Sequence, residues 1–187
     1  MVKIGQEVPD FKLAAFQNEE IKDIKLSDYK GKWVVVVFYP ADFTFVCPTE
    51  LEEVACLYPK FQAAGAEVIS VSTDTAFVHK AWHDESPAIG KVDYLMGADP
   101  TGAVSKLFGV YIEEEGLALR GTFIIDPDGN LKTSEVHDLG IGRSAAETLR
   151  KLEAAKFVHE HGDQVCPANW NPGCDTLIPG LDLVGKI

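Results

Sequence analysis

Long hydrophobic runs are absent from this 187-residue sequence. The longest is WVVVVFY, from Trp33 to Tyr39, whereas a membrane-spanning helix needs about 20 apolar residues. The first residues, MVKIGQEVPDFKLAAF, have no basic flank followed by an apolar stretch, so they do not resemble a secretory signal. We therefore expect a soluble, cytoplasmic protein that does not associate with membranes.

Basic side chains are also scarce. Lysine and arginine total 17 against 29 aspartates and glutamates, which gives a formal net charge of −12. This charge repels nucleic-acid phosphates and anionic lipid headgroups. We do not expect a nucleic acid among the partners of the protein.

Cysteine is sparse, and no two cysteines form a Cys-x-x-Cys pair, because the residue three after Cys47 is Glu50. The missing pair argues against a thioredoxin-type oxidoreductase and against a zinc site of paired cysteines. Structural disulfides are uncommon in the cytoplasm, so a permanent disulfide framework is not expected. The four cysteines are Cys47, Cys56, Cys166 and Cys174.

Resident cofactors and metals have little support either. No G-x-G-x-x-G motif follows a predicted strand, so no flavin or dinucleotide site is expected. His79 and His83 are spaced i, i+4 on a predicted helix, as metal ligands can be, but residue 80 is Lys rather than the Glu of a zinc-protease helix. We expect neither a cofactor nor a bound metal.

The order of the predicted elements indicates an α/β fold. Trp33 to Tyr39 is β-branched and aromatic, which predicts a strand buried on both faces. A helix follows from near Cys47, where Thr49 and Glu52 fit a Thr-x-x-Glu capping box. Glu67 to Thr73 predicts a second strand, and strand, helix, strand makes a right-handed βαβ unit.

The second half of the chain predicts a hairpin, a helix and a tail. Residues 120–125 and 130–136 are predicted strands joined by the turn sequence DPDG, and Ser144 begins an amphipathic helix with a capping box. The order is that of a thioredoxin-like fold, with a central mixed β-sheet flanked by helices and an extended C-terminal tail. We expect one thioredoxin-like domain over residues 1–160 and a C-terminal tail over residues 161–187.

Cys47 has two interpretations from the residues alone. Free cysteine is among the most buried residue types, and its neighbours Phe43, Phe45 and Val46 are apolar, which is typical of an inert core position. A cysteine at the first turn of a helix, however, lies against unpaired backbone N–H groups and the positive end of the helix dipole, which favour the thiolate. The thiolate is the form that attacks electrophiles.

The residues before Cys47 complete the pattern Pro-x-x-x-Thr-x-x-Cys, with Pro40 and Thr44. YPADFTFVCPTEL resembles the active-site signature of the peroxiredoxins, and SVSTDTAFVHKAWH, GTFIIDPDGN and GIGR resemble further segments of that family. VCPANW and the ending LDLVGKI are similar to the peroxidase subunits of bacterial alkyl hydroperoxide reductases, which are typical 2-Cys peroxiredoxins. This resemblance covers essentially the whole chain. It implies a thiol-dependent peroxidase that reduces hydrogen peroxide and organic hydroperoxides in antioxidant defence.

The roles of the site residues are those that the resemblance implies. Cys47 is implied to be the peroxidatic cysteine, which attacks a peroxide oxygen and becomes a sulfenic acid. Thr44 is implied to hydrogen-bond the peroxide, and Pro40 to shield the sulfur from water. Arg120 is implied to place its guanidinium near the thiolate, with Glu50 orienting it. The alternative for Arg120 is an ordinary surface cation at the start of a strand.

The tripeptide Val-Cys-Pro around Cys47 recurs around Cys166 in the tail. A sulfenic acid condenses readily with a nearby thiol, and the resemblance implies that Cys166 is this resolving thiol. It further implies a homodimer with an intersubunit Cys47–Cys166 disulfide, a ring of five dimers, and a flavin-containing disulfide reductase as electron donor. Thioredoxin is an equal chemical fit as the donor.

Several alternatives stay open from the sequence. Cys56 is expected on the solvent face of its helix, without a role. Cys174 could pair with Cys166, replace it as the resolving thiol, or have no role. A thiol–disulfide oxidoreductase and a non-enzymatic holdase chaperone are the alternative functions.

Overall fold

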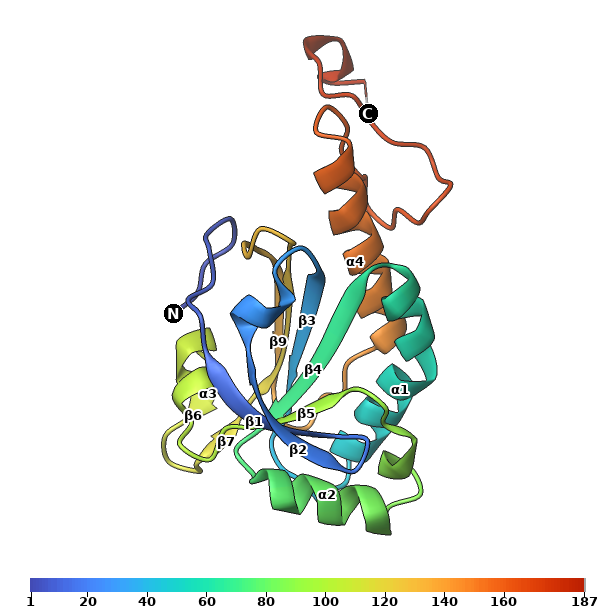
Figure 1. The fold of residues 1–187 in the computed structure, drawn as a ribbon. Coiled ribbons are helices and arrows are strands. Elements are labelled where there is room, and N and C mark those ends of the chain that lie inside the picture. Colours follow the sequence, from blue (N-terminus) through green and yellow to red (C-terminus); the bar gives the residue numbers. More distant parts are fainter. Residues whose placement is uncertain (187) are drawn as a thin grey trace.

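A seven-stranded mixed β-sheet forms the centre of the computed structural model, which describes residues 1–186 (Figure 1). The strands are β1 (Lys12–Gln17), β2 (Glu20–Lys25), β3 (Trp33–Phe38), β4 (Ala66–Ser72), β5 (Leu95–Ala98), β6 (Tyr111–Ile112), β7 (Leu117–Ala118), β8 (Arg120–Ile125) and β9 (Leu131–His137). Their order in the large sheet is β2-β1-β5-β4-β3-β8-β9, and β6 pairs with β7 in a small separate sheet. β3 is parallel to β4 and antiparallel to β8.

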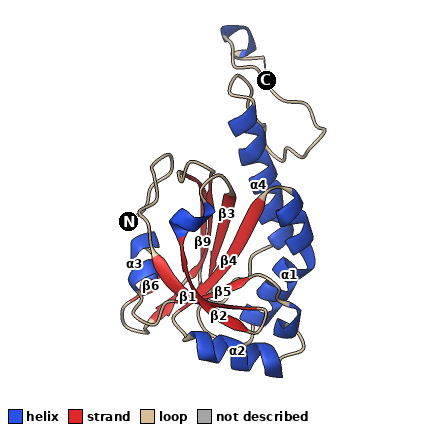
Figure 2. Ribbon diagram, in the orientation of Figure 1, coloured by secondary structure: helices blue, strands red, loops and turns tan. Residues whose placement is uncertain are grey.

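Helices cover both faces of this sheet (Figure 2). They are α1 (Cys47–Ala63), α2 (Ala76–Glu85), α3 (Ala103–Phe108) and α4 (Ala145–Glu160), with short 3-10 turns at Leu26–Tyr29, Ile89–Lys91 and Leu181–Leu183. Side chains of α1, α2 and α4 join the core on one face, and those of α3 join the core on the other. The predicted central sheet with flanking helices is therefore confirmed, as is the βαβ unit of β3, α1 and β4.

β3 is buried along its whole length because both of its faces meet apolar side chains. Val35 and Val37 pack into the core beneath α1 and α4, and Val34 and Val36 pack into the core on the α3 side. Successive side chains of a strand point to opposite faces, so a run of valines serves both cores. The prediction of a strand buried on both faces is confirmed. The end of this strand fixes where the loop before Cys47 begins.

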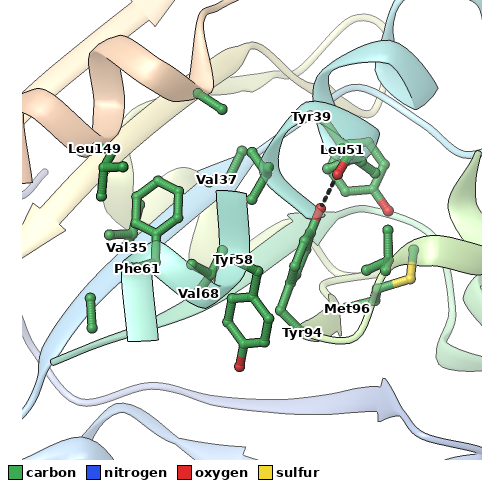
Figure 3. Close-up of a cluster of buried hydrophobic side chains, with 14 of the residues drawn as sticks. Val35, Val37, Tyr39, Leu51, Tyr58, Phe61, Val68, Tyr94, Met96 and Leu149 are labelled. Carbon is green, nitrogen blue, oxygen red and sulfur yellow. Dashed lines mark hydrogen bonds between the residues drawn. The ribbon is translucent and has the colours of Figure 1, made fainter. Parts of the chain in front are cut away.

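α1 begins at Cys47, as the sequence predicts, and lays its apolar side on the sheet (Figure 3). Its core side chains are Leu51, Val54, Tyr58 and Phe61. The predicted capping box is wrong, because the helix has already started when the chain reaches Thr49. The Thr49 hydroxyl donates to the Val46 carbonyl at 2.6 Å, and the Glu52 carboxylate pairs with Lys91.

α4 runs alongside α1 in the same direction. At its start the Ala145 amide donates to the Glu53 carboxylate at 3.0 Å, and near its end the Lys156 ammonium donates to the Ala64 carbonyl at 3.2 Å. Ser144 caps the helix as predicted, since its hydroxyl accepts from the Glu147 amide, but the other half of the predicted capping box is missing because the Glu147 carboxylate pairs with Arg150. Because both helices run away from the Cys47 end of the sheet, the tail leaves the molecule at the opposite end (Figure 1).

The N-terminal hairpin of β1 and β2 is not predicted by the sequence pattern. Asn18 and Glu19 both have positive φ, 50° and 64°, and join the strands as a two-residue turn. Such turns usually carry Asn-Gly, so the Asn-Glu here gives no recognisable signal. β2 is also mostly exposed and charged, which hides its period-2 pattern.

The tail after α4 is extended, as predicted, although residue 187 of the predicted segment lies outside the described residues. It folds back once, where Val165 and Leu177 exchange backbone hydrogen bonds of 2.8 and 3.0 Å. Within that loop Trp170 is buried against Phe157 of α4, with ring centroids 5.0 Å apart. Across residues 1–186, every helix is too short or too polar to cross a membrane.

The buried hydroxyl of Tyr94 ties the loop before β5 to α1. It donates to the Leu51 carbonyl at 2.9 Å, the bond drawn in Figure 3. We predict that Tyr94→Phe, which removes this bond without opening a cavity, lowers the free energy of unfolding by about 1 kcal/mol. Urea denaturation of the two proteins measures the difference, and equal midpoints with equal slopes would show that the bond contributes nothing.

Candidate active site

Cys47 is the first residue of α1, and its side chain is completely buried. The β3–α1 loop brings it there, and the apolar stripe of α1 fixes the direction of the helix against the sheet. The sulfur consequently lies at the positive end of a helix of 17 residues. Burial disfavours a charged thiolate, whereas the helix N-terminus favours it. The groups that contact the sulfur therefore decide which of the two effects is larger.

The guanidinium of Arg120 is the charged group in contact with Cys47. It comes from the first position of β8, and its Nη1 lies 3.4 Å from the Cys47 Sγ. Its Nε donates to the Leu139 carbonyl at 2.7 Å, and Nη1 also donates to the Glu50 carboxylate at 2.6 Å. Arg120 is buried, so the interpretation of this residue as an ordinary surface cation is wrong.

Arg143, for which no role is predicted from the sequence, completes the cluster around Glu50. Its backbone N–H and its Nε donate to Glu50 Oε1 at 2.7 and 2.8 Å, and its Nη2 donates to Oε2 at 3.1 Å. Arg143 belongs to the GIGR segment, which resembles the family and is the signal that could have found it, but nothing in that segment indicates that the arginine meets Glu50. Its place in the site comes from the long loop that carries it back from β9 to α1.

The cluster contains two cations and one anion. Burial by itself raises the pKa of Glu50, but the hydrogen bonds and charge of Arg143, together with the charge of Arg120, hold that pKa below its usual value. An ionised Glu50 neutralises one guanidinium only, which leaves one positive charge beside Cys47. A thiolate at Cys47 brings the buried cluster to neutrality, so the cluster stabilises negative charge on the sulfur.

Thr44 and Pro40 lie in the same β3–α1 loop. The Thr44 hydroxyl is partly buried and donates its hydrogen to the Ala41 carbonyl at 2.8 Å. Its oxygen lone pairs therefore remain free to accept a hydrogen bond from a ligand O–H. Pro40 is buried where the chain leaves β3. The loop thus offers an oriented acceptor and an apolar wall a few residues before the cysteine.

His79 is not available to a metal, because both of its ring nitrogens already have partners. Nδ1 lies 2.7 Å from Asp42 Oδ2, and Nε2 lies 3.1 Å from the Gly97 carbonyl. Its side chain is fully buried, whereas that of His83 is partly exposed and packs against the ring of Phe16. The two histidines therefore do not form a pair of ligands.

Cys166 does not approach Cys47 within the described chain. Its thiol points to the Ala154 carbonyl, with the sulfur 3.8 Å from the oxygen, in the second half of α4. Since α4 runs parallel to α1, this position is roughly 20 Å along the helix axis from Cys47, at 1.5 Å per residue. Burial raises the pKa of the Cys166 thiol, and the nearby guanidinium of Arg150 opposes this shift.

All four cysteines are free thiols in this structure. Cys56 is exposed on α1, as predicted, and Cys174 is exposed in the tail. The Cys174 carbonyl accepts a hydrogen bond of 3.1 Å from the indole of Trp170, which fixes the backbone there and leaves the thiol outside.

Comparison with known proteins places the chain in a family. A model described as the AhpC/TSA family matches residues 4–134, and one described as the C-terminal domain of 1-Cys peroxiredoxin matches residues 154–182. Proteins named alkyl hydroperoxide reductase C are similar over the full length of both chains, with 53% identity for those of Amphibacillus xylanus and Bacillus subtilis.

Solved structures agree with this placement. AhpC of Enterococcus faecalis matches with a TM-score of 0.86 and 48% identity, over 89% of this chain and 100% of that one. The reduced 2-Cys peroxiredoxin of Plasmodium vivax matches with a TM-score of 0.89 and 33% identity, over 92% of this chain and 91% of that one.

The thioredoxin-like fold and the full-length relatives define a thiol-dependent peroxidase, an oxidoreductase that reduces peroxides. The chain belongs to the AhpC/TSA family. The alternatives of a thiol–disulfide oxidoreductase and a holdase chaperone are not favoured by these comparisons.

The ion pairs of Glu50 predict a pH-dependent stability. Its pKa is lowered on folding, so the ionised carboxylate stabilises the fold above its usual pKa near 4.5, and this contribution is lost as the pH falls below that value. We predict that Glu50→Gln unfolds at lower urea concentration than the parent at neutral pH and loses less further stability on acidification. Glu160→Gln, at an exposed position, is the matched control and should follow the parent. Parallel pH profiles for the parent and Glu50→Gln would contradict the assignment.

Proposed function

We propose that Cys47 is the peroxidatic cysteine. Its thiolate attacks one oxygen of the peroxide, a sulfur–oxygen bond forms, and the O–O bond breaks. The cysteine is oxidised to a sulfenic acid, and the second oxygen leaves with a proton as water or an alcohol. The observation that supports this assignment is the buried Arg120 guanidinium, 3.4 Å from the sulfur and held by Glu50.

The other site residues act on this step from fixed positions. Arg120 lies close enough to the sulfur to stabilise both the thiolate and the charge that moves to the departing oxygen. Thr44 accepts the O–H of the bound peroxide, since its own hydrogen is committed to the Ala41 carbonyl. Pro40 walls the pocket against water, and Glu50 fixes the plane of Arg120.

Cys166 is the resolving thiol in this proposal. Its sulfur attacks the sulfenic sulfur of Cys47, water leaves, and a disulfide forms. Because Cys166 of the same chain lies at the far end of α4, the thiol that meets Cys47 is supplied by a partner subunit. Cys47 is completely buried, so the first turn of α1 must unwind before the two sulfurs can meet.

The remaining expectations belong to the same proposal. Residues 1–160 form the peroxidase domain, and residues 161–187 form the tail that carries the resolving cysteine. The disulfide-linked homodimer assembles into a ring of five dimers in the cytoplasm. A flavin-containing disulfide reductase or thioredoxin returns the disulfide to two thiols, and both reductants suit an exchange reaction at an accessible disulfide.

Substitution of the nucleophile tests the assignment most directly. We predict that Cys47→Ser abolishes peroxide consumption with a thiol reductant, because a serine hydroxyl is not ionised at neutral pH. The variant should keep the fold of the parent, since the two side chains are similar in size, and circular dichroism checks this. Cys56→Ser is the matched control on the same helix and should keep full turnover. Substantial peroxide consumption by Cys47→Ser would sink the proposal.

The two tail cysteines are separated by a gel experiment. We predict that Cys166→Ser still forms the sulfenic acid but gives no covalent dimer on a non-reducing gel after one equivalent of peroxide. Cys47 should then proceed to sulfinic acid, detected by mass spectrometry, because no thiol intercepts it. Cys174→Ser should leave the covalent dimer unchanged. A dimer that persists in Cys166→Ser and disappears only in the double variant would make Cys174 a working resolving thiol.

A further inference from the structure

A buried polar network lies under the β3–α1 loop, on the side away from Arg120. Its centre is the side chain of Asp42, two residues before Thr44. The hydroxyl of Tyr39 donates to Asp42 Oδ1 at 2.7 Å, and the ring of His79 meets Oδ2 at 2.7 Å. The side chains of Asp42 and His79 are both fully buried. The peroxidase chemistry described above uses none of these groups.

The backbone of Asp42 is held by a second carboxylate. Its N–H donates to Asp74 Oδ2 at 2.9 Å, and the same oxygen accepts the hydroxyl of Ser72 at 2.7 Å. Ser72 is the last residue of β4, so the acceptor is anchored to the central sheet. The loop between β3 and α1 is therefore bound through one residue to β4, α2 and, through the Gly97 carbonyl, β5.

This anchoring determines the direction of the Thr44 hydroxyl. The peptide unit between Ala41 and Asp42 is trans, so its C=O and N–H point in opposite directions. Asp74 holds the N–H, which directs the Ala41 carbonyl toward the Thr44 hydroxyl, 2.8 Å away. A rotation of this peptide would turn the Thr44 hydrogen, and with it the lone pairs, to a new direction.

The backbone at Phe43 shows that the loop is held under strain. Phe43 has φ of +54°, a left-handed conformation that a bulky residue rarely adopts. Such a conformation persists only where the surroundings determine it. The anchored Asp42 lies immediately before Phe43. The ring of Phe43 packs on Trp82 of α2, with ring centroids 5.9 Å apart.

We propose that Asp42 and Asp74, supported by Tyr39 and His79, are positioning residues that aim the Thr44 hydroxyl at the peroxide. They act through the Ala41–Asp42 peptide and do not touch the substrate. This proposal rests on the peroxide-binding role of Thr44 given above. It also assigns to His79 the task of holding the side chain of Asp42, since its ring bridges Asp42 Oδ2 and the Gly97 carbonyl.

Asp74→Ala is the test variant, because Asp74 is only partly buried and its removal leaves the core intact. Two second-order rate constants of reduced Cys47 are measured by mass spectrometry of its peptide, one with hydrogen peroxide and one with iodoacetamide. We expect the peroxide rate to fall by about tenfold or more, the order of loss for a misaligned transition-state hydrogen bond, and the alkylation rate to change by less than about twofold.

Asp74→Asn is the matched control, since the amide oxygen can still accept the Asp42 N–H, and it should restore most of the peroxide rate. Ser72→Ala removes only the hydroxyl that orients Asp74 and should give the same selective loss with smaller amplitude. This variant decides the question if Asp74→Ala no longer unfolds cooperatively. Equal losses in the peroxide and alkylation reactions would overturn the proposal, because they indicate general damage to the site.

A double-mutant cycle with Thr44→Val separates the two proposals. If the network acts through Thr44, Asp74→Ala should lower the peroxide rate little further in the Thr44→Val background. Fully additive losses would overturn the positioning role. A Thr44→Val protein with an unchanged peroxide rate would refute the peroxide-binding role of Thr44 itself. If Thr44→Val lowers the peroxide rate and Asp74→Ala does not, the network proposal is refuted and the role of Thr44 stands.

Discussion

The ion pairs of Glu50 with Arg120 and Arg143 join three distant segments of the chain, namely the first turn of α1, the start of β8 and the loop before α4. Arg120 reaches the sulfur of Cys47 from a fixed position because the Glu50 carboxylate accepts from the same nitrogen, Nη1, and the Leu139 carbonyl accepts from Nε. Two buried cations with one buried carboxylate leave a positive charge that only a further anion can balance. Breaking one partner of such a cluster leaves an uncompensated buried charge, which is strongly destabilising. The same contacts therefore serve the fold and the reactivity of the cysteine.

The proposed disulfide also requires the site to open. Cys47 is completely buried, and the thiol that we assign to resolve it belongs to a tail that leaves the molecule at the other end of α4. In the first turn of α1, Glu50 is held by polar contacts and only Cys47 joins the apolar core, whereas the rest of the helix adds Leu51, Val54, Tyr58 and Phe61 to that core, and the Leu51 carbonyl accepts from Tyr94. This division suits a short segment that unwinds while the rest of the helix stays in place. Local opening of this kind draws on the least apolar part of an element.

The loop before α1 is constrained on both of its sides. On the β8 side, Arg120 contacts the Cys47 sulfur and is held by Glu50. On the α2 side, the network of Asp42, Asp74 and His79 holds the backbone of the loop. Thr44 lies between them and has its hydroxyl fixed by the Ala41 carbonyl. Buried polar networks are costly when partly satisfied and rigid when complete. Every buried side-chain nitrogen and oxygen in the described part of the chain has a partner, so this network belongs to the rigid kind.

Local pattern in the sequence determined the elements that carry the site. The valine-rich β3, the helix that starts at Cys47 and the hairpin of β8 and β9 follow from side-chain periodicity and turn residues, which act over a few positions. The Pro-x-x-x-Thr-x-x-Cys pattern likewise lies within a single loop and helix start. The β1–β2 hairpin escaped prediction because its turn, Asn18-Glu19, has the positive φ angles of a tight turn without the usual glycine.

Tertiary structure alone decided the contacts between segments far apart in the chain. Arg143 lies 93 positions from Glu50, and His79 lies 37 positions from Asp42. In the sequence Arg143 belongs to the family-like segment GIGR but has no recognisable partner, and His79 looks like half of a metal-binding pair. In the folded chain Arg143 donates three hydrogen bonds to the Glu50 carboxylate. Both ring nitrogens of His79 have hydrogen-bond partners, so neither is free to bind a metal. Such pairings depend on where the sheet and its helices bring the backbone, because a side chain's charge or hydrogen-bonding capacity does not specify which distant partner will meet it.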